Sequence, residues 1–334
     1  MPEVVISHIS SGVAETGGYR QEQSLLKALS NFYNSKGWTV TSQTKRAHRF
    51  YKGIAHLTLL WHGFVRSNAD INIVVWRMAL PAILRNLLVR NHKILIPVHH
   101  YDEREITGMA GRVYFKTLMW ILSKIHFSNV ALISLSSSWN EYFTRLLNGK
   151  NAVFMYPTLL SIRNYAPHKV TQKINRIYLG QYSSKKHPDI YIIANELTAL
   201  GYQCYFSTLE KKQEGKFDSY EVKYMSYQEY LEWMAQSKYT ICFSGINEGW
   251  NRVAHESILV GTYVIANNAG GLGDLVRESG SLMAHSVDDI IRFVVANSIP
   301  ELNESFIERY DEQHTSLWLK PITDFLNIEA TLNS

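Results

Sequence analysis

The stretch Glu248–Glu256, EGWNRVAHE, holds the residue types whose spacing could do chemistry. It follows the apolar run Tyr239–Phe243, which predicts a buried strand, and leads into apolar residues at helical spacing over Val253–Val260. A helix that begins here points unpaired N–H groups and the positive end of its dipole at the preceding loop, which favours a diphosphate. Gly249 lacks a Cβ and would let a ligand approach the backbone. We expect the ligand to bind around Gly249, Trp250 and Asn251.

Two carboxylates flank this expected phosphate site. Glu256 lies about two turns into the predicted helix, where it could accept hydrogen bonds from the vicinal hydroxyls of a ribose. Glu248, in the loop, could accept one from a sugar hydroxyl. A ligand with a diphosphate between two polyols, such as a nucleotide-sugar, has the matching shape. The alternative is that both glutamates are solvated helix-end charges on an ordinary Rossmann-like domain.

The elements around these residues alternate between strand and helix. Gly261 ends the helix in the manner of a C′ glycine, Tyr263–Ala266 predicts a second strand, and Asn267–Gly273 predicts a glycine-rich turn before a helix that starts at Asp274. This order is typical of a parallel sheet in an α/β domain.

EGWNRVAHE and the following GTYVIANNAGGLGDLV resemble the Glu-x7-Glu motif and the glycine-rich stretch of retaining family-4 glycosyltransferases, although Tyr263 and Asp274 replace the family's usual proline and glutamate. The resemblance implies the α/β GT-B fold, two Rossmann-like domains facing each other across a cleft. It also implies a metal-independent hexosyltransferase that uses a nucleotide-diphosphate sugar and retains the anomeric configuration. Gly270 and Gly271 would then bind the donor.

The first half of the chain resembles the same family at two places. Gly17 and Gly18, between a predicted strand at Val4–Ile6 and a predicted helix over Tyr19–Tyr33, match a loop whose backbone comes near the donor phosphates. His99 and His100 follow the predicted strand Lys93–Val98, where the family has a histidine that contacts the transferred sugar. The sequence leaves open which of the two histidines takes that role, and a structural role is the alternative for both.

The second half matches the family less completely. After the predicted strand Ile174–Leu179, the family usually has an arginine and a lysine that both reach the diphosphate. Gln181 stands in the arginine position, and Lys185 or Lys186 matches the lysine. Losing one cation would weaken diphosphate binding unless the paired lysines compensate. A solvated pair in a turn is the alternative for the two lysines.

Composition limits the remaining possibilities. Hydrophobic residues make up 46% of the 334 residues, as in an ordinary globular chain, and the length favours two domains. Cys204 and Cys242 lie in apolar runs, so we expect buried thiols rather than a disulfide or a metal site. No signal peptide, transmembrane helix, metal site or cofactor beyond the donor substrate is predicted, which favours a cytoplasmic protein.

Charge is divided unequally along the chain. Residues 1–165 hold 19 Lys and Arg against 8 Asp and Glu, and residues 166–334 hold 15 against 21. Two predicted helices in the basic half, within 76–93 and 112–127, mix Arg and Lys with Leu, Ile, Trp and Phe. Such helices either lie on an anionic membrane surface, on its cytoplasmic side, or pack on the sheet with their basic ends in water. The half lacks the motifs of common RNA modules, so no nucleic-acid partner is predicted.

We therefore predict an N-terminal acceptor domain over residues 1–165, a donor domain over 166–310 and C-terminal helices over 311–334 that cross back to the first domain. Ser305–Leu319 predicts one helical stretch there. The predicted function is sugar transfer from a nucleotide-diphosphate sugar to a glycan or lipid-linked acceptor. The alternatives are a non-catalytic adaptor that binds a nucleotide-sugar, which the glutamine at 181 favours, and a nucleotide-sugar epimerase.

Overall fold

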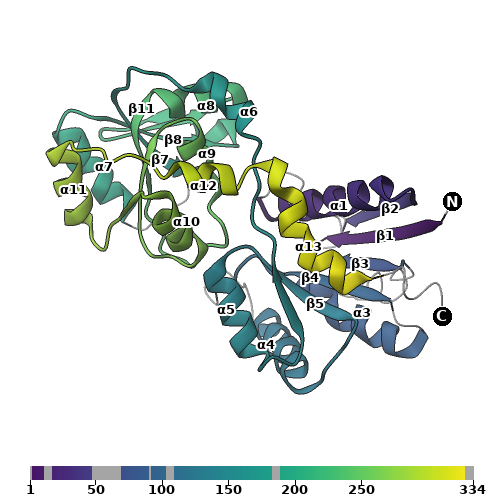
Figure 1. Cartoon of the computed structure of the whole chain (residues 1–334). Helices are drawn as coiled ribbons and strands as arrows, with labels where there is room; N and C mark the ends of the chain where they lie inside the picture. Colours follow the sequence, from purple (N-terminus) through teal and green to yellow (C-terminus); the bar gives the residue numbers. More distant parts are fainter. Residues whose placement is uncertain are drawn as a thin grey trace. The chain divides into compact units, whose positions relative to one another are not determined.

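The computed structural model describes residues 2–10, 17–46, 69–89, 92–102, 109–182 and 189–327. The chain divides into two compact units (Figure 1). The first comprises residues 1–158 and 314–334, and the second comprises residues 159–313. Each unit is built on its own mainly parallel sheet with helices, which confirms the predicted α/β class.

The sheet of the first unit has the strand order β2-β1-β3-β4-β5-β6, and every pairing within it is parallel. The central strands β3 and β5 are short, apolar and buried along their whole length, as expected where helices cover both faces, whereas β2 at the edge is largely polar. The strands are β1 (Glu3–Ser10), β2 (Thr39–Arg46), β3 (Ile71–Val74), β4 (Lys93–Pro97), β5 (Val130–Ser134) and β6 (Ala152–Met155).

The helices of this unit divide between the two faces of the sheet. Since β1 connects to β2 in one direction and β3 to β4 in the other, right-handed crossovers place their helices on opposite faces. The helices α3 (Trp76–Val89), α4 (Met109–Lys124) and α5 (Ser137–Leu146) share one apolar core with the sheet. The helix α1 (Gly17–Ser35) packs beside the C-terminal α13 (Thr315–Leu326), as Figure 1 shows.

The sheet of the second unit has the order β13-β12-β11-β7-β8-β10-β9, and only the edge pair β9–β10 is antiparallel. Successive residues of its strands face opposite sides, as the pleat requires: Ile177 and Leu179 belong to one core cluster and Tyr178 to the other. The strands are β7 (Ile174–Gln181), β8 (Gln203–Thr208), β9 (Gly215–Lys216), β10 (Glu221–Tyr224), β11 (Ser237–Cys242), β12 (Tyr263–Ala266) and β13 (Leu282–Met283).

Helices cover both faces of this second sheet. One core cluster includes side chains of α7 and α11, and the other includes side chains of α8 and α9. The two cysteines lie in these strands and are buried and free, as predicted. The helices are α6 (Ile162–Tyr165), a 3-10 turn (Ala166–His168), α7 (Ile190–Ala199), a 3-10 turn (Lys211–Gln213), α8 (Tyr227–Gln236), α9 (Arg252–Leu259), α10 (Gly271–Ser279), α11 (Val287–Ala296) and α12 (Glu304–Arg309).

The prediction of one helical stretch over Ser305–Leu319 is wrong. The chain forms α12, leaves helical geometry after Tyr310, makes a 3-10 turn over Glu312–His314 and only then enters α13. Backbone pairing explains the break. Glu312 N–H donates to the Leu160 carbonyl at 3.3 Å, and the Asp311 carboxylate accepts from the Ile162 N–H at 3.0 Å.

Strand order reverses direction once in each sheet, between β1 and β3 in the first unit and between β7 and β11 in the second. Ligands of open α/β sheets bind outside the carboxyl ends of the strands at such reversal points. In the second unit these ends are Gln181 and Cys242, so the loop that follows Cys242 and leads to Glu248 lies where a ligand site is expected.

Candidate functional site

The loop after β11 and the loop after β12 are joined by hydrogen bonds. The Glu248 N–H donates to the Ala269 carbonyl at 3.1 Å, and the Gly271 N–H donates to the Glu248 carbonyl at 3.0 Å. The side-chain amide of Asn267 accepts from the Ser244 N–H at 2.9 Å and donates to its carbonyl at 2.7 Å. The fold therefore brings Glu248, Gly270 and Gly271 together, although Glu248 and Gly270 are 22 positions apart in the sequence.

Glycine is required at 270 by backbone geometry. Its φ of 60° and ψ of −129° lie in a region that L side chains rarely adopt. Beside it, the mostly buried Glu248 carboxylate accepts a hydrogen bond from the Ser244 hydroxyl at 3.2 Å. Since the Gly271 N–H is used by Glu248, any ligand at this turn would meet the Glu248 side chain and Gly270 rather than that N–H group.

The start of α9 has the geometry expected of an anion site. Asn251 is its N-cap, and the Asn251 side-chain oxygen accepts from the Ala254 N–H at 2.9 Å. Among the described residues, the N–H groups of Gly249, Trp250 and Asn251 donate to no protein acceptor. Donors left without a partner at the positive end of a helix favour phosphate oxygens, although Gly249 and Trp250 are buried and Asn251 is half-buried.

Trp250 contributes to this site through its backbone, because its side chain points into the interior. The indole is 7% exposed, stacks at 10° to the Phe306 ring and packs 4.8 Å from the Tyr310 ring. Its N–H donates to His255 Nδ1 at 3.2 Å. Burial, and then the neighbouring Arg252 charge, lower the pKa of His255 to about 3, so the imidazole is a neutral acceptor.

The Glu256 carboxylate is enclosed by donors. The side chain is 3% exposed. It accepts hydrogen bonds from Arg252 Nε at 2.6 Å and from the hydroxyls of Tyr227 at 2.7 Å, Tyr230 at 2.9 Å and Tyr165 at 3.3 Å. Burial, and then the Glu256 charge, raise the pKa of Tyr227, Tyr230 and Tyr165, so these phenols stay protonated and donate.

Three of the four donors share Oε1, and Tyr230 is the donor to Oε2 among the described residues. A ribose hydroxyl could therefore bind Oε1 only by replacing a donor already present, because one oxygen has two lone pairs. The Tyr227 ring is 47% exposed and its helix begins at that residue, which makes Tyr227 the donor most easily displaced.

A second group of titratable side chains surrounds the start of α1 in the first unit. Glu22 lies on α1 and is buried between two histidines, with its carboxylate oxygens 2.8 Å from His8 Nε2 and 3.1 Å from His99 Nε2. Burial by itself raises the pKa of Glu22. Hydrogen bonds from His8 and His99, the His99 charge and a hydrogen bond from Ser10 outweigh burial and lower this pKa to about 2. The carboxylate is thus ionised and holds both rings.

Gly17 and Gly18 open α1, and Gly18 adjoins His99 directly. A Cβ at Gly18 would lie 2.8 Å from His99 Cδ2, so only glycine allows this ring position. His99 Nε2 is used by Glu22, while the buried His99 Nδ1 has no hydrogen-bond partner among the described residues. The structure therefore places His99 against Gly18 and Glu22, while His100 is half-buried.

Of the remaining predicted site residues, the structure describes Gln181 but neither lysine. Gln181 is the last residue of β7 and is exposed. Lys185 and Lys186 lie outside the described residues. Sequence reasoning missed Glu22, His8 and the tyrosines around Glu256. A glutamate four residues after a glycine pair, or a tyrosine at a helix start, gives no local sign of the partner that the fold brings to it.

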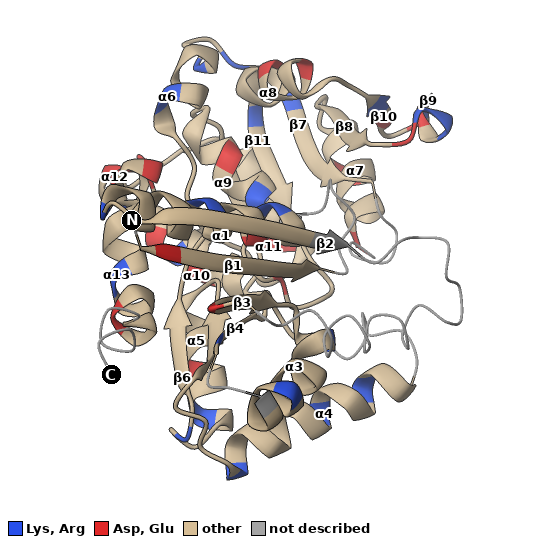
Figure 2. Ribbon diagram, turned by 90° about the vertical axis from the view of Figure 1, so that its right-hand side faces the viewer, with Lys and Arg blue, Asp and Glu red and all other residues tan. Residues whose placement is uncertain are grey.

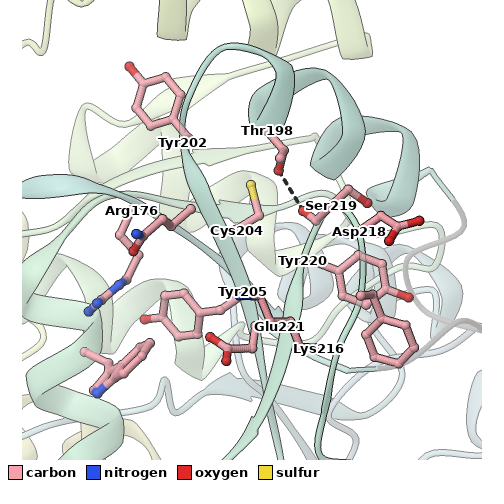
Figure 3. A pocket seen from close by; sticks show the side chains of 13 residues that line it. Arg176, Thr198, Tyr202, Cys204, Tyr205, Lys216, Asp218, Ser219, Tyr220 and Glu221 are labelled. Carbon is pink, nitrogen blue, oxygen red and sulfur yellow. Dashed lines mark hydrogen bonds between the residues drawn. The ribbon is translucent and has the colours of Figure 1, made fainter.

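A separate cavity of about 250 Å³ opens at the amino ends of β7, β8 and β10, the edge opposite the loop that bears Glu248 (Figure 3). The Arg176 guanidinium there lies 3.8 Å from the centre of the Trp233 ring, and the Thr198 hydroxyl donates to the Ser219 carbonyl at 2.7 Å. None of the predicted site residues lines it. This cavity and the candidate site are therefore different places.

Within the described part of the chain, none of the helices is long and apolar enough to span a membrane. Among the same residues, no group of three or more His, Cys, Asp or Glu is placed to hold a metal ion.

Comparison with solved structures supports the fold. Sucrose-phosphate synthase from Thermosynechococcus elongatus aligns over 97% of this chain and 99% of its own, with a TM-score of 0.71 and 14% identity. HepE from Anabaena, in complex with UDP and glucose, aligns over 99% of both chains with a TM-score of 0.61 and 13% identity. The catalytic domain of starch synthase IV from Arabidopsis thaliana, bound to ADP and acarbose, covers 97% of this chain and 92% of its own, with a TM-score of 0.52 and 13% identity.

These likenesses confirm the predicted fold, the two-unit α/β GT-B arrangement of such glycosyltransferases. Identities this low show the fold alone. No family model matches the chain, and no curated protein matches it.

Proposed function

We propose that this protein is a glycosyltransferase that moves a hexosyl group from a nucleotide-diphosphate sugar to an acceptor with retention of the anomeric configuration. The observation that carries the proposal is the turn before α9. It presents the N–H groups of Gly249, Trp250 and Asn251, which have no acceptor in the described part of the chain, beside Glu248 and Gly270, within a fold found among glycosyltransferases. A diphosphate at those N–H groups would place a sugar within reach of the Glu248 carboxylate.

The proposed chemistry depends on stabilising negative charge on the leaving diphosphate. When the bond between the sugar and the diphosphate breaks, negative charge builds up on the leaving phosphate. The N–H donors at the start of α9 are already oriented and would stabilise that charge without a metal ion. Lys185 and Lys186 would add positive charge. We propose that Glu248 and His99 hold sugar hydroxyls and that the departing phosphate takes the proton of the acceptor hydroxyl.

The nucleoside end of the donor would meet Glu256. One ribose hydroxyl would take over the position on Oε1 that the Tyr227 hydroxyl fills, because Tyr227 is the most exposed of the tyrosine donors. The other would donate to Oε2, beside the Tyr230 hydroxyl. The bound carboxylate would again be fully hydrogen-bonded, so the exchange leaves no buried charge unpaired.

We propose a glycan or a lipid-linked sugar as the acceptor. Peripheral attachment to the inner face of an anionic membrane would bring the protein to an acceptor of the second kind. The basic first half of the sequence, with 19 Lys and Arg against 8 Asp and Glu, supports this location.

A thermal-shift panel of UDP-, GDP- and dTDP-sugars tests the donor proposal. At a hundred times its dissociation constant, a ligand stabilises its site by about 2.7 kcal/mol, which raises the melting temperature by roughly 5–10 °C in a unit of this size. The stabilising donor is then incubated with and without candidate acceptors, and NMR of the product gives the anomeric configuration. An inverted product would contradict retention, and a panel without any shift would contradict donor binding.

Gln181 favours one second candidate, a non-catalytic adaptor. An exposed glutamine ends β7 where the family-4 glycosyltransferases that the sequence resembles usually carry an arginine, so one charge-assisted bond to the diphosphate would be missing. An adaptor would be stabilised by a donor sugar but would neither transfer nor hydrolyse it.

A further inference from the structure

The helices α3 and α4 bear an outward surface that the sugar-transfer proposal does not use. Their inward side chains, including Ile83, Phe115 and Leu122, pack into one core with the sheet. Their outward side chains repeat at helical spacing, so they share a side of each helix. We call this surface the α3/α4 face; it consists of Arg77, Leu84, Leu87 and Leu88 of α3 and Met109, Arg112, Val113, Lys116, Trp120 and Lys124 of α4.

Large apolar side chains are unusually exposed on this face. Trp120, at the centre of the outward side of α4, is 61% exposed, and Leu87 and Leu88 are 67% and 68% exposed. The helices α3 and α4 contact each other, so these side chains lie on neighbouring helices of the first unit. An apolar region of this kind, rimmed by polar side chains, marks an interaction site rather than ordinary surface.

The charges of the face have one sign. Neither α3 nor α4 contains an aspartate or a glutamate, while Arg77, Arg112, Lys116 and Lys124 accompany the apolar side chains. Figure 2 shows Lys and Arg but no Asp or Glu along both helices. Leucine and tryptophan among lysine and arginine, without acids, is the composition of helices that lie in the headgroup region of an anionic bilayer.

We propose that the α3/α4 face docks the protein on an anionic lipid bilayer. Trp120 and the three leucines enter the boundary between headgroups and acyl chains, and the basic side chains meet lipid phosphates. A bound nucleic acid would leave the exposed leucines of the α3/α4 face next to water and phosphate. Its polar backbone therefore does not complement the apolar part of this face. The inference deepens the proposed use of a lipid-linked acceptor and rests on that proposal for its purpose, but lipid binding is measurable without donor or acceptor.

The test is flotation of the full chain with vesicles of phosphatidylcholine alone and with an equal share of phosphatidylglycerol, over a range of salt. The protein should float only with the anionic vesicles, and less as salt rises. Because each cation near such a surface changes binding by roughly fivefold, the pair Lys116→Gln and Lys124→Gln should weaken it by roughly 25-fold. The control pair Lys211→Gln and Lys212→Gln, on the exposed turn of the second unit, should leave it unchanged.

The apolar part of the face needs its own variants. The pair Leu87→Ser and Leu88→Ser, and separately Trp120→Ser, should each weaken flotation, whereas Leu209→Ser, equally exposed in the second unit, should not. Quenching of tryptophan fluorescence by brominated lipids should fall in Trp120→Phe if that ring enters the bilayer. All variants should keep the wild-type melting temperature and donor binding.

Three results would overturn the proposal. The first is no flotation with anionic vesicles at low salt. The second is flotation that the face variants and the control variants change equally. The third is self-association without lipid that Trp120→Ser abolishes, which would identify a second copy of the chain as the occupant. Each can occur whether or not the protein transfers sugar, so failure of docking and failure of the proposed function are distinguishable.

Discussion

Removing single hydroxyls from the donors around Glu256 should separate their structural role from their proposed role in donor binding. Tyr227→Phe and Tyr230→Phe each remove one hydrogen bond to the same carboxylate, at 2.7 and 2.9 Å. The two sites differ in exposure, since the Tyr227 ring is 47% exposed while Tyr230 is half-buried within a core cluster. The pair is therefore a matched experiment on one acceptor.

The magnitudes follow from what each change leaves behind. Loss of the Tyr230 hydroxyl leaves Glu256 Oε2 without its only protein donor in the described set, so we expect about 1.5–3 kcal/mol of destabilisation. Oε1 keeps Arg252 and Tyr165 after Tyr227→Phe, and water can reach the site, so the loss should be about 1 kcal/mol or less. The melting temperature should therefore fall by roughly 3–12 °C in Tyr230→Phe and by at most about 4 °C in Tyr227→Phe.

Affinity for the nucleoside diphosphate should separate Tyr227→Phe from loss of the Glu256 charge. Tyr227→Phe vacates a position on Oε1 that the ribose is proposed to fill, so calorimetric titration should show affinity for the nucleoside diphosphate equal to or above that of the wild type. Glu256→Gln removes the charge and should weaken binding at least about tenfold, or about 1.4 kcal/mol. If Tyr227→Phe weakens binding as much as Glu256→Gln, the hydroxyl helps to bind the ligand instead of competing with it, and the reasoning is refuted.

Three further predictions follow. Gly18→Val should lower the melting temperature and displace the His99 ring in an imidazole NMR spectrum, because the added Cβ would lie 2.8 Å from His99 Cδ2; an unchanged spectrum would contradict this packing. The buried His255 has a folded pKa of about 3, below its unfolded value of ~6.5, so the free energy of unfolding should fall as pH drops from ~6.5 toward 3. Chemical unfolding measured across this pH range should show that this fall is smaller in His255→Phe than in the wild type. The exposed control His285→Phe should keep the wild-type fall. Chelation by EDTA should change the transfer rate by less than about twofold, since oriented N–H groups are proposed to do the work of a metal; loss of activity restored by Mg²⁺ would contradict that.

Local signals in the sequence predicted the elements around the site closely. The apolar run ending at Phe243 corresponds to β11, and the helical spacing over Val253–Val260 corresponds to α9. The helix predicted to start at Asp274 begins three residues earlier, because Gly271 is already the first residue of α10 and Gly270 is its N-cap. These signals are local because strand burial, helix capping and the backbone freedom of glycine act within a few residues. The order of elements then determined the fold class.

Side-chain partners were not predictable, because they depend on residues distant in the sequence. Tyr165 and Glu256 are 91 positions apart, and His8 and His99 meet only through a glutamate on α1. The indole of Trp250 turns inward because α12, more than fifty residues later, supplies Phe306. The break between α12 and α13 also escaped prediction, because pairing with Leu160 ends the first helix. The roles assigned to the site residues stay predictions.

A crystal structure of the protein with a bound nucleoside diphosphate tests the central claim most directly. We predict phosphate oxygens within hydrogen-bonding distance of the N–H groups of Gly249, Trp250 and Asn251, and ribose hydroxyls on Glu256 with Tyr227 moved aside. A diphosphate bound away from the start of α9, with the four donors around Glu256 still in place, would contradict the account.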